Sequence, residues 1–273
     1  MEEEMEYRPG KIGVEVRGID LKKNVPEEII EKIKKDVHVH KLLIFKNQGV
    51  ISGERHAEIS RWFGELESTF YKHERSPHPD VFRVSNDSVE GCRGVGRTGW
   101  HIDGSFMKQP FRFAIYHMVS VPREGSTAFI SLHDLINRLP REKRDKWNSL
   151  WMVSNGHYDV IHPLIYPHPS TGQPTMCFHL GMIAEIVSDV GHFNERVFDD
   201  DETKDVLNDI YTEINKNKDL IYKHQWEEGD FIISDNLAVG HEATPETQYP
   251  VSQVGLRVLH RSTIKGVNSP SKS

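Results

Sequence analysis

The sequence has no apolar run near the roughly 20 residues that a membrane-spanning helix needs. Its two cysteines, Cys92 and Cys177, are too few for a disulfide framework and favour a reducing environment. The acidic start, MEEEMEYRPG, lacks the apolar segment of a secretory signal peptide. We therefore expect a cytoplasmic protein that does not contact membranes.

A basic tract is missing as well. Lysine and arginine number 34 against 41 aspartates and glutamates, giving a net charge of -7, so we expect no nucleic-acid partner. The glycine-rich phosphate motifs and the Gly-x-Ser-x-Gly elbow of hydrolases do not occur. Histidine is abundant instead, with 16 copies, and it binds metals and moves protons near neutral pH. The histidines are therefore the first candidates for a chemical site.

Hydrophobic patterning predicts one domain over residues 1–273, with short strands and fewer helices. Because the regular strand–helix alternation of a doubly wound sheet is missing, an α+β protein with a β-sandwich or jelly-roll core fits best. We expect helices over residues 26–37, 52–64, 135–147 (broken at Pro140) and 201–216, and a helical insertion over about 132–220. Strands are expected over residues 42–45, 81–84, 100–103, 113–119, 127–131, 231–234 and 256–263.

A glycine-rich loop is expected over about residues 86–99, with Gly91, Gly94, Gly96 and Gly99. Long irregular loops in compact domains are often lids over active sites. A plain exposed connection explains the same composition equally well.

The strongest chemical signal is the segment Gly99-Trp100-His101-Ile102-Asp103. Side chains at positions i and i+2 of a strand point to the same face, so His101 and Asp103 can reach one metal ion. With one more histidine they would form the facial triad used for ferrous iron. His241, which follows a predicted strand and a short loop, is the candidate third ligand, although alone it would read as a surface histidine.

Two arginines lie close together in the last predicted strand. Arg257 and Arg261 share a face with Leu259 if the strand is regular. A buried arginine is costly unless an anion pairs with it, which favours a carboxylate partner. A solvated arginine face is the competing interpretation, and residue parity alone does not decide between them.

Together these motifs resemble the taurine dioxygenase family of iron(II)- and 2-oxoglutarate-dependent oxygenases over nearly the whole chain. The resemblance also includes the stretch Gly125-Ser126-Thr127, a His-Pro…His-Pro segment and a Gly-Asp…Asp-Asn…His run, at residues 125–127, 162–172 and 229–241. It implies a double-stranded β-helix (jelly-roll) core with flanking helices.

The resemblance also implies the site. His101, Asp103 and His241 would hold Fe(II), while Thr127 and Arg257 would bind the distal carboxylate of 2-oxoglutarate. O2 would be consumed, with succinate and CO2 released as hydrogen is abstracted from a substrate C–H bond; hydroxylation, desaturation and ring closure all remain open. The substrate would be a small anionic or amino-acid-like molecule bound by Arg261, Phe106 and Gly104.

Two departures from the family pattern put taurine itself in doubt. Thr69 stands where the taurine enzyme has a sulfonate-binding histidine, and Arg97 replaces an asparagine near the metal motif. The family is often oligomeric, so a homo-oligomer is possible. A non-catalytic metal-binding jelly-roll sensor and a zinc hydrolase are the competing function classes; the sensor would not need Arg257, and the hydrolase would need a general base that the sequence does not offer.

Overall fold

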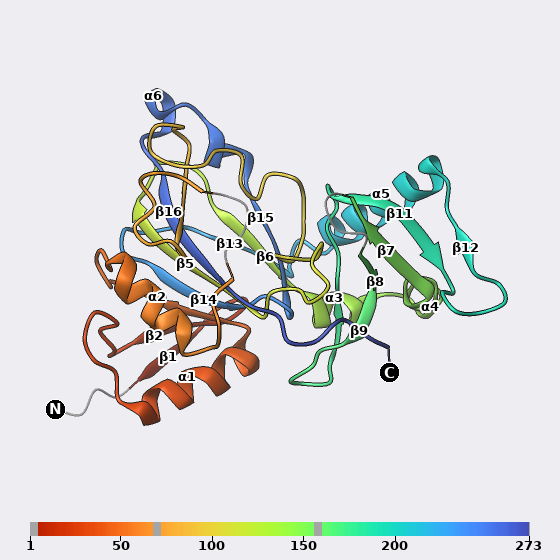
Figure 1. The fold of residues 1–273 in the computed structure, drawn as a ribbon, viewed down its shortest axis with the longest axis horizontal. Coiled ribbons are helices and arrows are strands. Elements are labelled where there is room, and N and C mark those ends of the chain that lie inside the picture. Colours follow the sequence, from red (N-terminus) through yellow and green to blue (C-terminus); the bar gives the residue numbers. More distant parts are fainter. Residues whose placement is uncertain (1–4, 68–71, 156–159, 273) are drawn as a thin grey trace.

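A computed structural model describes residues 5–67, 72–155 and 160–272 (Figure 1). The helices are α1 Glu27–His40, α2 Gly53–Arg61, α3 Leu132–Arg138, α4 Arg141–Ser149, α5 Asp200–Lys216 and α6 Val251–Val254, with a 3-10 turn at Pro245–Gln248. The first strands are β1 Glu6–Pro9, β2 Val14–Arg17, β3 Leu42–Phe45, β4 Phe82–Ser85, β5 Phe113–Ser120 and β6 Thr127–Ser131. The later strands are β7 Leu150–Ser154, β8 Ile161–Pro163, β9 Ile165–Pro167, β10 Pro174–Met176, β11 Ile183–Ser188, β12 Arg196–Val197, β13 Ile221–His224, β14 Phe231–Asp235, β15 Val239–Ala243 and β16 Val258–Ile264.

Two facing sheets form the core. The major sheet has the order β1-β2-β3-β14-β5-β16-β4, and the minor sheet has the order β13-β6-β15. All pairings in them are antiparallel except β2 with β3. Phe129 of β6 and Val239 of β15 pack with Ile44 and Ile232 of the major sheet, so a shared apolar core lies between the sheets. This is the sandwich that a jelly roll requires.

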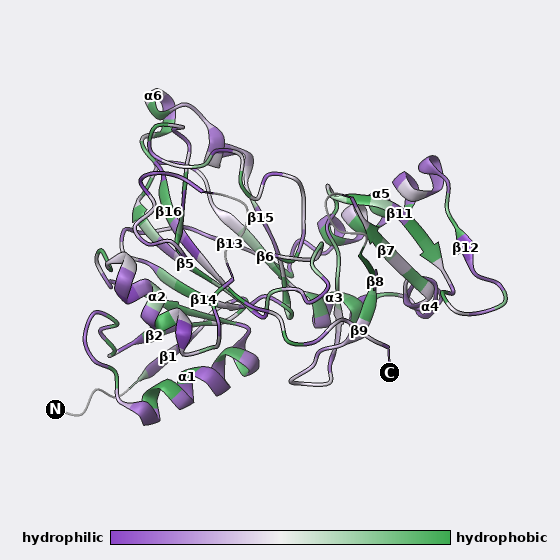
Figure 2. Cartoon of the chain, in the orientation of Figure 1, coloured by the Kyte–Doolittle hydropathy of each residue, from purple (hydrophilic) through white to green (hydrophobic). Residues whose placement is uncertain are grey.

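The other face of the major sheet carries α1 and α2. Leu43 and Phe45 of β3 pack on this side, while Leu42 and Ile44 enter the core between the sheets. The unbroken apolar run of β3 is therefore explained by burial on both faces. Figure 2 shows hydrophobic and hydrophilic residues alternating along α1, and the buried ones are Ile30, Ile33 and Val37.

The insertion at residues 132–220 differs from the prediction of a helical segment. It contains α3, α4 and α5, but also the β12-β11-β7-β8 sheet and the β9–β10 hairpin, so it is mixed α/β. Trp147, Ile210 and Ile214 of the insertion pack in one apolar cluster that also includes Ile130 of β6 and Leu237, so the insertion shares its core with the jelly roll. Strand β7 was not predicted, because its residues LWMV are all apolar and show no alternation in the sequence. Only the structure shows that Leu150 and Met152 are buried while Trp151 and Val153 are partly exposed.

Most other elements form where they were expected, and the helix break at Pro140 is confirmed. The predicted strand at 100–103 is wrong as a continuous strand. Only His101 makes bridges, one to His179 and one to His241, and the chain turns immediately afterwards. Of the helices in the described residues, none combines the length and apolar character needed to cross a membrane.

Candidate active site

Backbone pairing brings the first and last residues of the predicted triad together. The His101 amide donates to the His241 carbonyl (3.1 Å), and the His241 amide donates to the His101 carbonyl (2.9 Å). His241 lies on β15, which β6 fixes within the minor sheet. The two imidazole centroids are 4.4 Å apart as a result. A turn after His101 then directs Asp103 toward both rings.

The ligand atoms converge on one point. His101 Nε2 lies 3.9 Å from Asp103 Oδ1, and His241 Nε2 lies 3.6 Å from Asp103 Oδ2. His101 Nδ1 is 2.7 Å from the Gly99 carbonyl oxygen, so Nδ1 carries the proton and donates it. The lone pair of Nε2 is therefore free to bind a metal. Two neutral imidazoles and a carboxylate with converging donor atoms fit a divalent iron site.

Burial sets the charge state of these groups. Burial lowers the pKa of His101 and lowers that of His241 to about 3, so both rings are neutral near pH 7. Burial alone would raise the pKa of the Asp103 carboxyl, but the nearby Arg261 guanidinium and His241 hold it below its usual value. The triad is thus in the deprotonated form that metal binding requires.

Arg261 supports the Asp103 carboxylate. Its NH1 donates to Asp103 Oδ1 at 2.8 Å, and its guanidinium carbon lies 4.3 Å from the centroid of the Phe82 ring. The side chain is buried, and its Nε has no hydrogen-bond partner among the described residues. Arg261 therefore neutralises the carboxylate, and one of its buried guanidinium donors stays unsatisfied.

A cavity lies beside the triad. Its lining includes all three predicted substrate-binding residues, Arg261, Phe106 and Gly104, together with His101 and Asp103. Gly104 has a φ of +74°, and a Cβ there would lie 2.7 Å from the Phe111 ring, so a side chain does not fit without rearrangement.

The glycine-rich loop borders the same cavity through Val95, Gly96 and Thr98. The loop is attached to the strand that carries His241, because the Ala243 amide donates to the Gly96 carbonyl at 2.9 Å. Arg97 donates to the Ala243 carbonyl at 2.5 Å, so part of its guanidinium is used within the protein.

Arg257 and Thr127 are both buried. Arg257 has no ion pair with a described residue, its Nε lacks a hydrogen-bond partner there, and burial lowers its pKa to about 10. Thr127 Oγ1 accepts a hydrogen bond from Trp226 Nε1 at 3.1 Å. A buried guanidinium without an acidic partner fits a site for a carboxylate ligand.

The interpretation that both arginines lie on a solvent-exposed face of the strand is wrong, because Arg257 and Arg261 are only 2% and 5% exposed. Residue parity could not settle this, since both faces of β16 are buried. The register of β16 against β5 also shifts between Val258 and Leu259, so Arg257 does not follow the alternation of the strand.

Two residues next to the triad were not predicted. His179 pairs with His101, and their rings stack with centroids 4.6 Å apart. The Gly181 amide donates to His179 Nδ1, and burial lowers the pKa of His179 to about 2. The Tyr116 hydroxyl lies 3.4 Å from Asp103 Oδ2 and 3.3 Å from His241 Nε2. No spacing relative to His101, Asp103 or His241 in the sequence points to either residue.

Thr69, the predicted departure from the taurine enzyme, lies outside the described residues.

A family model of the taurine catabolism dioxygenase TauD, TfdA family matches residues 4–263. The chain belongs to this family. Membership confirms the predicted reaction class: the protein is an Fe(II)- and 2-oxoglutarate-dependent dioxygenase, an oxidoreductase that uses O2.

Similar proteins cover most of the chain at low identity. An alkylsulfatase from Acinetobacter baylyi is 23% identical over 94% of this chain and 83% of its own length. An alpha-ketoglutarate-dependent sulfate ester dioxygenase from Pseudomonas putida is 22% identical over 96% of this chain and 90% of its own. The crystal structure of a taurine dioxygenase from Burkholderia xenovorans has a TM-score of 0.79 at 23% identity, covering 98% of this chain and 94% of that one. The predicted α+β jelly-roll fold is confirmed by this likeness.

Proposed function

We propose that the chain acts as a single dioxygenase domain that oxidises a C–H bond of a small anionic molecule, one bearing a sulfate ester, sulfonate or carboxylate. The observation that carries the proposal is a buried arginine, Arg261, that lines the cavity beside the triad and keeps an unsatisfied donor. Two relatives bear names that refer to sulfate esters, which agrees with an anionic substrate.

We assign the metal to His101, Asp103 and His241. Their donor atoms lie within 4.8 Å of one another, and all three side chains are buried. The bound Fe(II) supplies, with 2-oxoglutarate and O2, the oxidising chemistry that removes a hydrogen atom from the substrate. The chain keeps the His101 lone pair directed inward through Gly99 and keeps Asp103 ionised through Arg261.

We assign Arg257 and Thr127 to the distal carboxylate of 2-oxoglutarate. The support is the buried guanidinium of Arg257, which has donors to spare and no acidic partner in the described chain. The Thr127 hydroxyl accepts from Trp226, so its own proton is available for a carboxylate oxygen.

The substrate itself is assigned to Arg261, Phe106 and Gly104. The guanidinium of Arg261, which lines the cavity, would bind the anionic group, while the half-buried Phe106 contributes apolar surface. Gly104 lets the Phe111 ring pack directly against the backbone beside Asp103, and its own backbone borders the cavity. We also propose that residues 86–99 close over the cavity, since Val95, Gly96 and Thr98 already line it.

The test begins without a substrate. Under anaerobic conditions, adding 2-oxoglutarate to the Fe(II)-loaded protein should produce a weak visible charge-transfer band. Arg257→Ala should weaken 2-oxoglutarate binding by about 2–5 kcal/mol, at least about 30-fold in Kd, while iron binding stays unchanged. Arg123→Ala, at an exposed arginine, is the control.

Alkyl sulfates, sulfonates, carboxylates and amino acids would then be screened for coupled succinate release. Release that depends on a sulfate ester, sulfonate or carboxylate supports the proposal. A protein that binds iron but gives neither the band nor succinate would instead be a non-catalytic ligand sensor. Equal 2-oxoglutarate affinity in Arg257→Ala would contradict the assignment of Arg257.

A further inference from the structure

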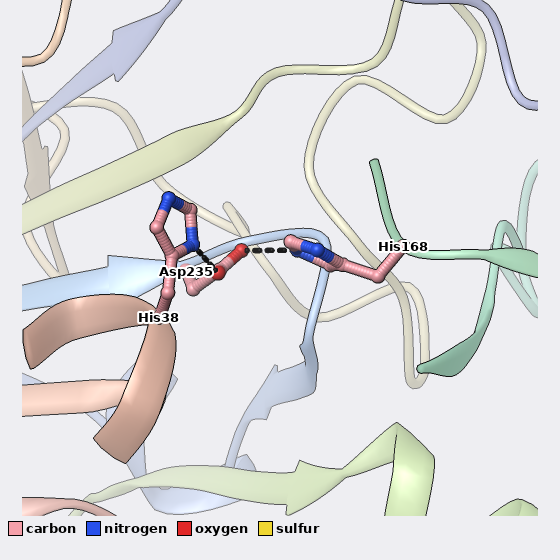
Figure 3. A group of neighbouring side chains, drawn as sticks. All are labelled: His38, His168 and Asp235. Atoms are coloured by element: carbon pink, nitrogen blue, oxygen red, sulfur yellow. Dashed lines mark hydrogen bonds and ion pairs between the residues drawn. The ribbon is translucent and has the colours of Figure 1, made fainter. Parts of the chain in front are cut away.

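A second histidine–aspartate cluster lies outside the triad, and its aspartate, Asp235, precedes His241 on the next strand. Asp235 accepts from His38 Nδ1 at 2.6 Å and from His168 Nε2 at 3.1 Å (Figure 3). The three residues come from α1, from the loop between β9 and β10, and from the end of β14. Asp235 and His168 are buried, so the cluster joins the N-terminal helix and the insertion to the core.

Hydrogen bonding shows why this cluster is a structural one. His168 Nδ1 accepts from the amides of Ser170 and Thr171, both at 3.2 Å, so the ring proton must lie on Nε2. Nε2 then donates to Asp235 and offers no lone pair to a metal. Each Asp235 oxygen therefore binds one imidazole, which fixes the carboxylate and the chain that follows it.

The next residue is Asn236, whose side chain is buried and fully used. Its Oδ1 accepts from the Asp103 amide at 2.8 Å, and its Nδ2 donates to the Asp103 carbonyl at 2.9 Å. Nδ2 also donates to the Phe111 carbonyl at 2.6 Å. Asn236 thus holds both backbone polar groups of a proposed metal ligand.

A second buried asparagine, Asn86, holds the backbone amide of Arg257. Asn86 Oδ1 accepts from the Arg257 amide at 2.9 Å, and its Nδ2 donates to the carbonyls of Tyr249 and Gly255, at 3.1 and 2.9 Å. Asn86 and Asn236 are each 4% or less exposed, and each makes three bonds to backbone. Asn236 bonds both backbone polar groups of Asp103, whereas Asn86 bonds only the amide of Arg257, whose carbonyl accepts from Ser85 Oγ instead.

We propose that Asn236 and Asn86 are positioning residues, Asn236 for metal binding through Asp103 and Asn86 for 2-oxoglutarate binding through Arg257. The proposal rests on the function proposed above. The two asparagines have equivalent roles in packing, so loss of either should cost similar stability. Their effects on the two ligands should be separate.

The experiment compares Asn236→Ala and Asn86→Ala in the full chain. Mn(II) affinity would be measured by calorimetry without 2-oxoglutarate. 2-Oxoglutarate affinity would be measured by the charge-transfer band at saturating Fe(II) without O2. Urea unfolding would report the stability of each variant, and Asn236→Asp, which keeps the side-chain volume and one acceptor, provides a second variant if Asn236→Ala does not fold.

Asn236→Ala should weaken Mn(II) binding by about 10–100-fold, the range typical of residues that orient metal ligands, and Asn86→Ala by less than about threefold. For 2-oxoglutarate the order should reverse. Parallel loss of both ligands in both variants, tracking the urea midpoint, would overturn the proposal, as would Mn(II) binding by Asn236→Asp at wild-type affinity. A wild-type protein that binds no Mn(II) would instead contradict the assignment of His101, Asp103 and His241.

Discussion

Two clusters in this molecule contain the same set of side chains, two histidines and one aspartate. In each cluster the three donor atoms are close enough to one another to hold an ion. In one cluster the His101 Nδ1 proton goes to the Gly99 carbonyl, which leaves the Nε2 lone pair facing Asp103. In the other cluster, backbone amides donate to His168 Nδ1. The ring proton therefore lies on Nε2, which donates a hydrogen bond to Asp235. The hydrogen-bond partner of Nδ1 thus distinguishes the proposed metal site from the structural cluster.

The aspartates differ in the same way. Asp103 receives one strong ion pair, from Arg261, and it faces a cavity. Asp235 receives an imidazole on each oxygen and an additional bond from the Leu237 amide. Burial would raise the pKa of both carboxyls, yet their cationic and hydrogen-bonding partners lower it below the usual value in both cases. The two aspartates therefore do not differ in charge. They differ in their hydrogen bonds, because protein donors bond both oxygens of Asp235, whereas Asp103 faces a cavity.

Metal stoichiometry tests this comparison with the largest expected effect. The wild-type protein should bind one equivalent of Mn(II). His101→Gln should lose more affinity than the roughly 10–100-fold caused by changes around a metal site, because it removes a ligand. The matched variant His168→Gln should keep one equivalent. A second equivalent in the wild type that disappears in His168→Gln would show that the structural cluster is a metal centre.

Stability should show the opposite ranking. Asp235→Asn replaces two bonds to an ionised carboxylate and should lower the free energy of unfolding by about 2–4 kcal/mol in urea. His101→Gln, measured without metal, should cost less, because it removes a single hydrogen bond between neutral groups, from His101 Nδ1 to the Gly99 carbonyl. An equal cost for the two variants would contradict the structural role of Asp235.

The pH dependence of that difference follows from the lowered pKa of Asp235. A lowered carboxyl pKa contributes stability that is present above the unfolded value, about 3.9, and is lost as the pH falls through the folded value. The gap between wild type and Asp235→Asn should therefore be nearly constant near neutral pH and narrow below about pH 4.

His38→Gln should give the smallest effect. The His38 side chain is 24% exposed, so losing its bond to Asp235 should cost only about 0.5–1.5 kcal/mol. His168→Gln, at a buried side chain, should cost more. The Mn(II) affinity of His38→Gln should stay within about twofold of wild type. A larger loss would mean that α1 also supports the metal site.

Much of the fold was predictable from local patterns. β6 lies at residues 127–131 as expected, and the break between α3 and α4 falls at Pro140, which cannot donate the helical hydrogen bond. The spacing of His101 and Asp103 suggested that they share a metal ion, and the resemblance to the dioxygenase family added His241 to them. Their roles as ligands remain a prediction that the metal experiments test.

Contacts between distant segments were not predictable. His38 reaches Asp235 because α1 packs on the far face of the major sheet. His179 reaches His101 through a single β-bridge, which leaves no periodic signal in the sequence. The strands of the insertion are short and are stabilised by pairing with one another, so their own residues indicate them weakly.

The place of β16 in the major sheet has a consequence for the order of folding. Among the strands that the structure describes, β16 lies between β5 and β4, and β4 pairs with no other strand of that sheet. During synthesis, the segments with His101, Asp103 and His241 leave the ribosome before β16 does. A nascent chain therefore holds all three proposed iron ligands before it has Arg257 or Arg261. We expect the jelly roll to close only after β16 is released, which makes the arrival of the two arginines the step that completes the catalytic pocket.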